Sequence, residues 1–324
     1  MSKMKFSKIL VTGGAGFIGS HLVDRLMGRD FSVKVVDNLS VGSAENIKSW
    51  LDNPRFKFVH GDLKDPSVAY ESINDAEVVL HLAANSEVRV GETDPSVHFN
   101  ENLLVTFNLL EAMRKSEKAK FMVFASSSTV YGEPDRFPTP EGYGPLLPIS
   151  IYGASKLGCE SLISSYCHTF NLTGIMLRFA NIVGSRATHG VVIDFINKLR
   201  QNPMELEILG DGKQTKSYLH VKDLIDAVFV VLENFNENNI VGIYNVGSPD
   251  QVNVIRIAEI VCEEMGINKP VFKFNISVKD GRGWKGDVKT MQLSIGKLMG
   301  LGWKPSLESE DAIRLSCNEL LKCI

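Results

Sequence analysis

The chain has no long apolar run, no excess of positive charge and no segment of biased composition. None of its 324 residues falls in a stretch of membrane-spanning length. The apolar run after the basic start is too short for a signal-peptide core. The formal net charge of −3 gives no global attraction to nucleic acid or to an anionic membrane. We therefore expect neither a nucleic acid nor a membrane as a partner.

The cysteines are few and scattered. They are odd in number and form no CxxC pair, which argues against both a disulfide framework and a metal site. A reduced, cytoplasmic setting is the default expectation. The five residues are Cys159, Cys167, Cys262, Cys317 and Cys323.

The most informative segment is residues 8–38, where a strand, a glycine turn and a helix are predicted in succession. Residues 9–11 are apolar and suit a buried parallel strand, and helical periodicity begins at Phe17. Between them, glycines give a tight turn on which a diphosphate can approach bare backbone. A second apolar strand ends in Asp37, about twenty residues on, where a carboxylate binds an adenosine ribose. An acid there favours NAD because it repels a 2′-phosphate. A glycine-rich stretch can also be a flexible loop, but the strand, helix and acid in this order favour a dinucleotide site.

Strands and helices continue to alternate after this unit, which predicts a Rossmann-like doubly wound parallel sheet. The further strands are expected at 56–59, 78–82, 121–125 and 174–179, and the helices near Pro66, from Asp94 to Met113 and from Tyr152 to Phe170. Residues 39–54 and 132–150 are predicted loops, the second over the carboxyl edge of the sheet.

Beyond residue 181 the predicted elements are shorter and scattered. Helices are expected at 191–200, 221–232, 255–265 and 307–321, with brief strands near Ile208 and Tyr244. We expect an NAD-binding domain over 1–180 and a smaller α/β substrate domain over 181–324, with some segments of the latter returning to the sheet.

Two strand ends carry further candidates for cofactor contacts. Asp62 follows the third strand and could touch the adenine amino group, but Asp62 or Asp65 could equally cap the helix near Pro66. Ala83 and Ala84 follow the fourth strand, where small residues let a ribose lie close.

Tyr152 and Lys156 lie one helical turn apart, so both project from one face of a helix. An ammonium beside a phenol lowers the pKa of the phenol and makes it a usable base near neutral pH. Such pairs also occur by chance. This pair opens the helix after the strand that ends in Ser126, Ser127 and Ser128, a position that favours the catalytic interpretation.

A series of motifs extends from residue 12 to residue 181. They are TGGAGFIG at 12–19, Asp37, Gly61-Asp62-Leu63, HLAA at 81–84, SSSTVYG at 126–132, YGASK at 152–156 and RFAN at 178–181. In this order they resemble the extended short-chain dehydrogenase/reductase family, and within it the nucleotide-sugar epimerase branch.

The resemblance implies roles for individual residues. Ser127 would hydrogen-bond a sugar hydroxyl and share its proton with Tyr152, while Lys156 would hold the nicotinamide ribose. Ser126 and Ser128 stay open as hydrogen-bonding residues of the strand end. The implied NAD-binding set is Gly13, Gly16, Phe17, Ile18, Gly19, Asp37, Asn38, Asp62, Leu63, Leu82, Ala83, Ala84, Asn102, Tyr152 and Lys156. Asn102 matches a recurring helix asparagine for which a structural role is also expected.

The same resemblance implies a substrate set in the second half of the chain: Ser127, Asn181, Lys216, Arg282 and Asp287. The family's Arg-Asp is replaced by Lys216-Ser217, and a lysine lacks the bidentate fork of arginine. A second family arginine is displaced to Arg282 or replaced by Lys285. These cations are either phosphate ligands or solvated surface charges.

Dehydratases of the family carry Asp-Glu, and decarboxylases usually a Glu, where this chain has Ser128 and Thr129. The resemblance therefore implies NAD-dependent C4 epimerisation of a nucleotide-diphosphate sugar, with UDP-glucose and UDP-galactose as the first pair. Met291 stands where narrow-specificity relatives often have tyrosine, so N-acetylhexosamines are a further candidate unless Met291 is core filler.

The competing predictions are a 4-ketosugar reductase, a 4,6-dehydratase or a non-catalytic NAD-binding regulator. Relatives pair through the helices that begin here at Asp94 and Tyr152, so a homodimer with a four-helix bundle is expected. All-buried packing in a monomer would give the same pattern.

Overall fold

The computed structural model describes residues 6–234, 236, 240–278 and 280–323. The chain forms two compact units from interleaved segments. The first comprises 1–127, 154–178 and 228–244, and the second 128–153, 179–227 and 245–324. The assignment of NAD binding to 1–180 and of sugar-nucleotide binding to 181–324 stays a prediction.

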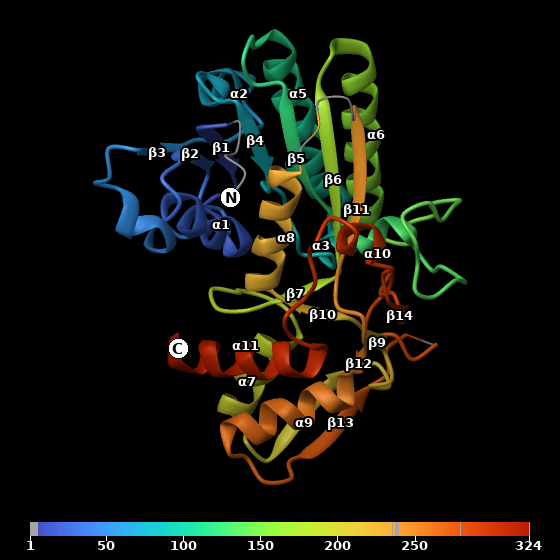
Figure 1. The fold of residues 1–324 in the computed structure, drawn as a ribbon. Coiled ribbons are helices and arrows are strands. Elements are labelled where there is room, and N and C mark those ends of the chain that lie inside the picture. The colour runs from blue at the N-terminus through green and yellow to red at the C-terminus, as the bar shows by residue number, and fades with distance from the viewer. Residues whose placement is uncertain (1–5, 235, 237–239, 279, 324) are drawn as a thin grey trace. The chain divides into compact units, whose positions relative to one another are not determined.

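The first unit is built on a seven-stranded sheet in the order β11-β6-β5-β4-β1-β2-β3 (Figure 1). Its strands are β1 (Lys8–Thr12), β2 (Ser32–Asp37), β3 (Phe56–His60), β4 (Val78–His81), β5 (Phe121–Ser127), β6 (Thr173–Phe179) and β11 (Val241–Val246). β1 pairs in parallel with β2 and β4, β2 with β3, and β4 with β5. The predicted α/β class and parallel central sheet are confirmed. The strand expected near Tyr244 is β11, which returns to this sheet beside β6.

The helices of this part of the chain follow the predicted alternation. They are α1 (Phe17–Met27), α2 (Pro66–Ile73), α3 (Val90–Thr93), α4 (Pro95–His98), α5 (Val105–Lys115), α6 (Ile151–Phe170) and α8 (Val221–Glu233). The helix expected from Asp94 to Met113 contains a π-helical turn, η2 (Phe99–Leu104). The predicted loop 39–54 contains a 3₁₀ turn, η1 (Ala44–Trp50), because the Ser43 side chain accepts the Glu45 N–H and caps it.

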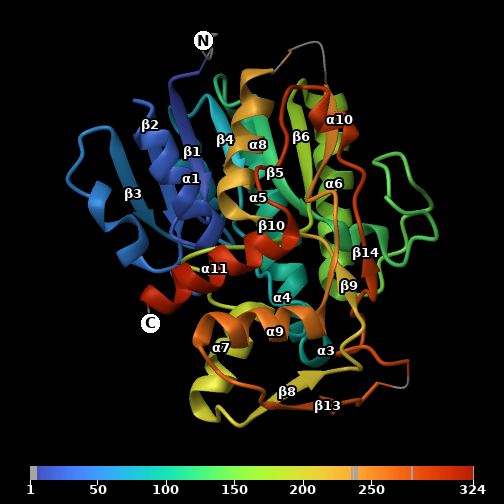
Figure 2. The same cartoon turned by 60° about the horizontal axis from the view of Figure 1, so that its bottom comes forward.

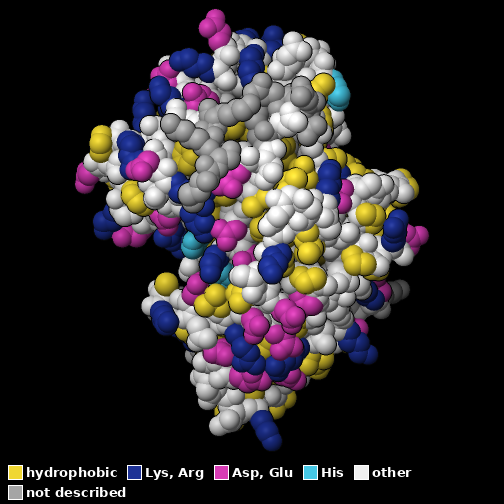
Figure 3. All heavy atoms as spheres, viewed as in Figure 1, with side chains coloured by type: hydrophobic (Ala, Val, Ile, Leu, Met, Phe, Trp, Pro, Cys, Tyr) yellow, Lys and Arg dark blue, Asp and Glu magenta, His cyan; other side chains and the backbone are white. Residues whose placement is uncertain are grey.

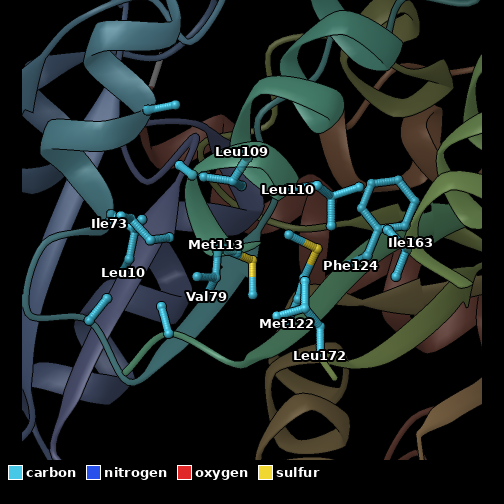
Figure 4. Close-up of a cluster of buried hydrophobic side chains, with 14 of the residues drawn as sticks. Leu10, Ile73, Val79, Leu109, Leu110, Met113, Met122, Phe124, Ile163 and Leu172 are labelled. Carbon is cyan, nitrogen blue, oxygen red and sulfur yellow. The ribbon is translucent and has the colours of Figure 1, made fainter. Parts of the chain in front are cut away.

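Buried side chains from both sides of the strands explain the doubly wound arrangement. Leu10, Val79, Met122 and Phe124 of the strands belong to one cluster with side chains of α2, α5 and α6 (Figure 4). Ile9 and Val11 alternate with Leu10 and are also buried, as are Leu22, Val23 and Leu26 of α1. Burying both faces of a parallel strand requires helices on each side of the sheet.

The second unit has its own core and three small sheets, ordered β10-β7, β12-β9-β14 and β13-β8. Its elements include β7 (Asn181–Val183), α7 (Val191–Gln201), β8 (Glu205–Leu209), β9 (Thr215–Lys216), β10 (Tyr218–His220), β12 (Val252–Asn253), α9 (Val254–Met265), β13 (Val271–Asn275), β14 (Thr290–Met291), α10 (Gly296–Met299) and α11 (Ser309–Cys323) (Figure 2). Helix α11 begins two residues after the expected Leu307. The Ser306 and Leu307 N–H groups just before it donate to the Asp223 carboxylate.

Charged side chains of both signs gather over α9 and α11 (Figure 3). Arg256 pairs with Glu259, Glu263 and Glu310, and Arg314 pairs with Glu263 and Glu264. These pairs join the two helices at the surface. Among the helices in the described ranges, none is both long enough and apolar enough to cross a membrane.

Candidate functional site

The glycine turn between β1 and α1 leaves no room for side chains. Gly13 has φ of +69°, which favours glycine, and a Cβ on it would lie 2.8 Å from the Ala83 nitrogen. A Cβ on Gly19 would lie 2.1 Å from the Gly13 carbonyl oxygen. Gly16 caps the following helix without any side-chain hydrogen bond. The turn thus presents bare backbone at a helix start, as a dinucleotide diphosphate requires. The neighbouring Phe17 and Ile18 are the first residues of α1.

Asp37 links the end of β2 to this turn. Its Oδ2 accepts the Ala15 N–H at 3.0 Å and its Oδ1 accepts the Leu39 N–H at 2.8 Å. A carboxylate oxygen has a second lone pair, so each can also accept a ribose hydroxyl. The carboxylate therefore both fixes the loop and suits the predicted ribose contact.

The cap of α2 is Asp65, whose side chain accepts the Ser67 N–H. Asp62 instead accepts the Asn38 amide at 3.2 Å and the Lys64 N–H at 2.9 Å. Burial acts to raise the pKa of Asp62, but these bonds and the Lys64 ammonium outweigh it and leave the pKa lowered. The capping alternative thus belongs to Asp65, and the adenine contact of Asp62 stays a prediction. Leu63 is buried beside it.

A buried histidine ties together the carboxyl ends of β1 and β4. His81 Nδ1 lies 2.7 Å from the Thr12 hydroxyl, and its Nε2 lies 3.0 Å from the Thr106 hydroxyl. The Thr106 hydroxyl donates its proton to the Asn102 carbonyl, so towards His81 it can only accept, and His81 Nε2 carries the hydrogen. The unprotonated Nδ1 therefore accepts a hydrogen bond from the Thr12 hydroxyl. Burial, with a smaller contribution from the Lys156 charge, lowers the pKa of His81 to about 3. Thr12 also accepts the Ala83 N–H, which holds the segment Leu82–Ala84 beside the glycine turn.

Asn102 lies in the π-helical turn and is buried. Its Oδ1 accepts the Asn85 N–H at 2.7 Å, and its Nδ2 donates to the Asn85 carbonyl and to the Ser155 hydroxyl. The amide connects the loop after β4 to α6. This agrees with the structural role expected for it, and its cofactor contact stays a prediction.

Lys156 is a buried cation on α6, 3% exposed. Its Nζ donates to the Ala125 carbonyl at 2.9 Å and lies 4.8 Å from the centroid of the Phe124 ring. Burial lowers the pKa of Lys156 to about 8, while Cys159 and Glu160 act in the opposite direction. Tyr152 lies one turn earlier on the same helix. A lysine with such a pKa can exchange protons near neutrality.

The three consecutive serines have different surroundings. Ser126 is buried and donates to Glu160 Oε1 at 2.5 Å. Ser127 is the last residue of β5, and Ser128 begins the 3₁₀ turn η3 (Ser128–Tyr131). Ser126 is thus committed to a carboxylate, which supports the preference for Ser127 as the hydroxyl that meets the substrate.

Sequence reasoning missed Glu160, and it included Arg178 in the RFAN motif without giving it a role in this site. Arg178 Nε donates to Glu160 Oε1 at 2.9 Å, and its second guanidinium nitrogen donates to Oε2 at 2.7 Å. The available signal was the spacing of Tyr152, Lys156 and Glu160 at four-residue intervals on one helix.

In the second unit the structure brings together three of the predicted substrate residues. Lys216 Nζ lies 2.6 Å from Asp287 Oδ1, and Arg282 donates to the Asp287 carbonyl at 2.7 Å. Arg282 also pairs with Glu133 and Asp280, and these two carboxylates, Glu133 first, raise the pKa of its guanidinium. The cations are therefore paired with carboxylates, not solvated individually, and a phosphate would have to exchange with these partners.

Asn181 and Met291 lie in the small sheets of this unit, next to the segment that contains Lys216. The Asn181 amide donates to the Ser217 carbonyl at 3.1 Å. Met291, on β14 beside Lys216, is 6% exposed, which favours its reading as core filler.

Comparison with known proteins identifies the group to which these features belong. Residues 9–247 match the NAD dependent epimerase/dehydratase family. The chain is 36% identical over 316 residues, 96% of this chain and 97% of the relative, to a Methanocaldococcus jannaschii protein named "Putative UDP-glucose 4-epimerase".

Solved structures agree over nearly the whole length. A UDP-galactose 4-epimerase superposes with a TM-score of 0.86 at 43% identity, covering 98% of this chain and 99% of that one. The Thermus thermophilus UDP-glucose 4-epimerase in complex with NAD gives 0.84 at 32% identity, covering 98% and 100%. Other similar proteins are a UDP-glucuronic acid decarboxylase, a UDP-glucuronic acid 4-epimerase and a dTDP-glucose 4,6-dehydratase.

Proposed function

The chain belongs to the NAD dependent epimerase/dehydratase family, and from this premise we propose that it interconverts the C4 epimers UDP-glucose and UDP-galactose. The observation that carries the proposal is the buried Lys156 ammonium one turn from Tyr152, beside a strand end where Ser128 and Thr129 replace carboxylates. Such a site can move a proton but has no added acid–base pair for eliminating water.

The residues of the first unit fit NAD. The glycine turn would hold the diphosphate and Asp37 the adenosine ribose, and the backbone of the small residue Ala83 packs directly against the turn. When bound there, NAD would supply the reversible hydride acceptance that oxidation and reduction at the sugar C4 require.

The protein's own groups move the proton. Tyr152, as phenolate, takes the proton of the 4-hydroxyl through or beside Ser127, and a ketone forms at C4. The nucleotide stays anchored while the keto sugar turns about its diphosphate link. Tyr152 then returns the proton to the inverted C4 oxygen. The Lys156 ammonium stabilises the phenolate and, being held to Ala125, cannot swing away.

The second unit would anchor the nucleotide. Lys216 and Arg282 supply positive charge and Asn181 an amide, while Asp287 keeps Lys216 in place. Phosphate oxygens would replace the exposed carboxylates of Glu133 and Asp280 around the Arg282 guanidinium. Because phosphate and carboxylate are both anions, this exchange needs no additional cation.

A homodimer through α5 and α6 is part of the proposal. Phe99, Phe107 and Phe170 are 57%, 41% and 37% exposed. The Phe107 and Phe170 rings each contact Tyr166, so α5 and α6 share an aromatic surface. A second copy placing the same helices against this surface would bury it in a four-helix bundle.

The test is interconversion without stoichiometric cofactor. Purified protein incubated with UDP-galactose should form UDP-glucose with no net consumption of added NAD. Tyr152→Phe should lower kcat by about 10²–10⁴-fold, the usual contribution of a general acid–base group. Tyr70→Phe is the matched control, because Tyr70 packs against the core on α2 and should retain full activity.

Other outcomes separate the competing activities. Consumption of reduced cofactor in proportion to product would identify a ketosugar reductase. A product sugar that has lost one molecule of water would identify a 4,6-dehydratase. Bound dinucleotide without turnover of any UDP-sugar would identify a non-catalytic NAD-binding protein. Parallel assays with the N-acetylhexosamine pair would define the sugar range.

A further inference from the structure

Two hydrogen bonds join the end of β5 to successive turns of α6. Lys156 Nζ donates to the Ala125 carbonyl at 2.9 Å, and Glu160 Oε1 accepts from the Ser126 hydroxyl at 2.5 Å. Lys156 and Glu160 are four residues apart and so lie on one helix face, while their partners are consecutive on the strand. Two such points fix both the distance and the rotation of the strand end against the helix.

Arg178 on β6 holds Glu160 in its position. The guanidinium meets both carboxylate oxygens, at 2.9 Å and 2.7 Å, and the two side chains are only 2% and 5% exposed. Buried ion pairs need good geometry and satisfied remaining lone pairs to offset their desolvation. The Ser126 hydroxyl supplies an additional bond to the carboxylate, so the strand end belongs to the same buried network.

The network ends next to the reacting groups. Ser127 follows Ser126 directly, and Tyr152 lies one turn before Lys156 on α6. We propose that Glu160 is a positioning residue, which Arg178 orients and which sets where Ser127 stands relative to Lys156. This inference rests on the proposed function, because it presumes that Ser127, Tyr152 and Lys156 form the reacting set.

The charges around Lys156 identify Glu160 as its ionised neighbour on α6. Burial lowers the pKa of His81 on β4 and of His98 on α4, so both are neutral near pH 7. Burial likewise raises the pKa of the Cys159 thiol, which stays protonated. Glu160 favours the charged form of Lys156, and Arg178 on β6 pairs with the same carboxylate. The electrostatic potential at Lys156 therefore depends on the Glu160–Arg178 ion pair staying intact.

The first experiment removes only the bond to the strand. Ser126→Ala should lower kcat roughly tenfold, as expected for a small misplacement of reacting groups, and leave KM and NAD content unchanged. Ser126→Thr keeps a hydroxyl and should restore most of the rate. Ser309→Ala is the matched control, because Ser309 is a buried serine that donates to a carboxylate, Asp250, at 3.0 Å in the second unit. It should lower the melting temperature comparably and leave kcat unchanged.

The second experiment does not depend on turnover. Glu160→Gln removes a negative charge and leaves Arg178 uncompensated, so the pKa of the Tyr152 phenol should fall. The ultraviolet difference spectrum of phenolate formation, with Tyr152→Phe as the reference for each protein, measures it. If Glu160→Gln fails to fold, the kcat and KM of Ser126→Ala remain the test of the positioning role, because that variant keeps both buried charges.

The outcomes separate the two proposals. An active wild type whose kcat is unchanged in Ser126→Ala, or equally reduced in Ser309→Ala, would overturn the positioning role alone. A wild type that turns over no UDP-sugar would overturn the proposed function, and a phenol titration unchanged in Glu160→Gln would overturn the positioning role whether or not the wild type is active.

Discussion

Neutral, buried His81 makes folding stability depend on pH. The unfolded histidine takes up a proton near its ordinary pKa of 6.5, while burial lowers the pKa of the folded one to about 3. Between these values the unfolded state binds more protons, so stability is full above pH 6.5 and falls as the pH drops towards 3. The slope contributed by this group approaches about 1.4 kcal/mol per pH unit.

His81→Gln should therefore be less stable at pH 7 but should lose less stability between pH 7 and pH 5 than the wild type. Urea unfolding at both pH values measures the difference. His168→Gln, which alters an exposed histidine, should behave as the wild type does. Equal losses in His81→Gln and wild type would contradict the assignment of a neutral folded His81.

Lys156 should impose an alkaline limit on activity. Burial lowers the pKa of Lys156 to about 8, so its ammonium is lost as the pH rises through that value, and the phenolate loses its partner. The kcat of the wild type should fall above about pH 8. Lys156→Arg keeps its charge, so the limit should move to higher pH even though the larger guanidinium lowers the maximum rate. A pH–rate profile with the same alkaline limb in both proteins would exclude Lys156 as its source.

Residues with a fixed local spacing could be predicted from the sequence, and residues defined by distant contacts could not. Gly13, Asp37 and Lys156 stand in motifs whose spacing reflects one turn or one helix. The role of Glu160 on α6 depends on Arg178, which lies eighteen residues away on β6. The carboxylates around Arg282 include Glu133, which is remote in sequence, so the pairing of that cation had no local signal.

The strand–turn–helix element has no room for a side chain where Gly19 of the helix approaches the Gly13 carbonyl of the turn. Because a Cβ on Gly19 would lie 2.1 Å from the Gly13 oxygen, Gly19→Ala must displace the turn. We expect NAD binding to weaken by about 1–3 kcal/mol, a typical cost of overpacking. Titration calorimetry with NAD measures it. Gly28→Ala is the matched control, since its Cβ would lie 3.4 Å from the nearest atom, and unchanged affinity in Gly19→Ala would refute the close approach.

The aromatic surface on α5 and α6 should control assembly. Phe107→Asp places a charge on that surface, so it should give a monomer in light scattering at concentrations where we expect the wild type to be a dimer. Phe274→Asp is the control, because Phe274 on β13 is 44% exposed against 41% for Phe107 and lies outside the two helices. Dissociation in both variants, or in neither, would count against a four-helix bundle.

The periodicity of apolar residues predicted most helices and strands, but it did not predict the π-helical turn in the segment from Asp94 or the sheet to which β11 belongs. The segment from Asp94 has a helical pattern, and its π-helical turn depends on Asn102 bonding to Asn85 and Ser155. β11 is short and apolar like many surface strands, and only its pairing beside β6 places it in the central sheet. Such tertiary bonds have no counterpart in local propensity.

At the scale of the molecule, we expect NAD to bind the first unit and the nucleotide of the substrate to bind the second unit, because these units carry the residues predicted for each. NAD should slow amide hydrogen exchange in the turn between β1 and α1, and UDP should slow it around Lys216 and in residues 282–287. A site stabilised by bound ligand opens less often, by RT ln(1 + [L]/Kd), about 2.7 kcal/mol at a hundredfold excess over Kd. Adenosine alone is the control for the diphosphate contribution. Protection by UDP confined to the glycine turn would contradict the assignment of Lys216, Arg282 and Asp287 to the nucleotide sugar.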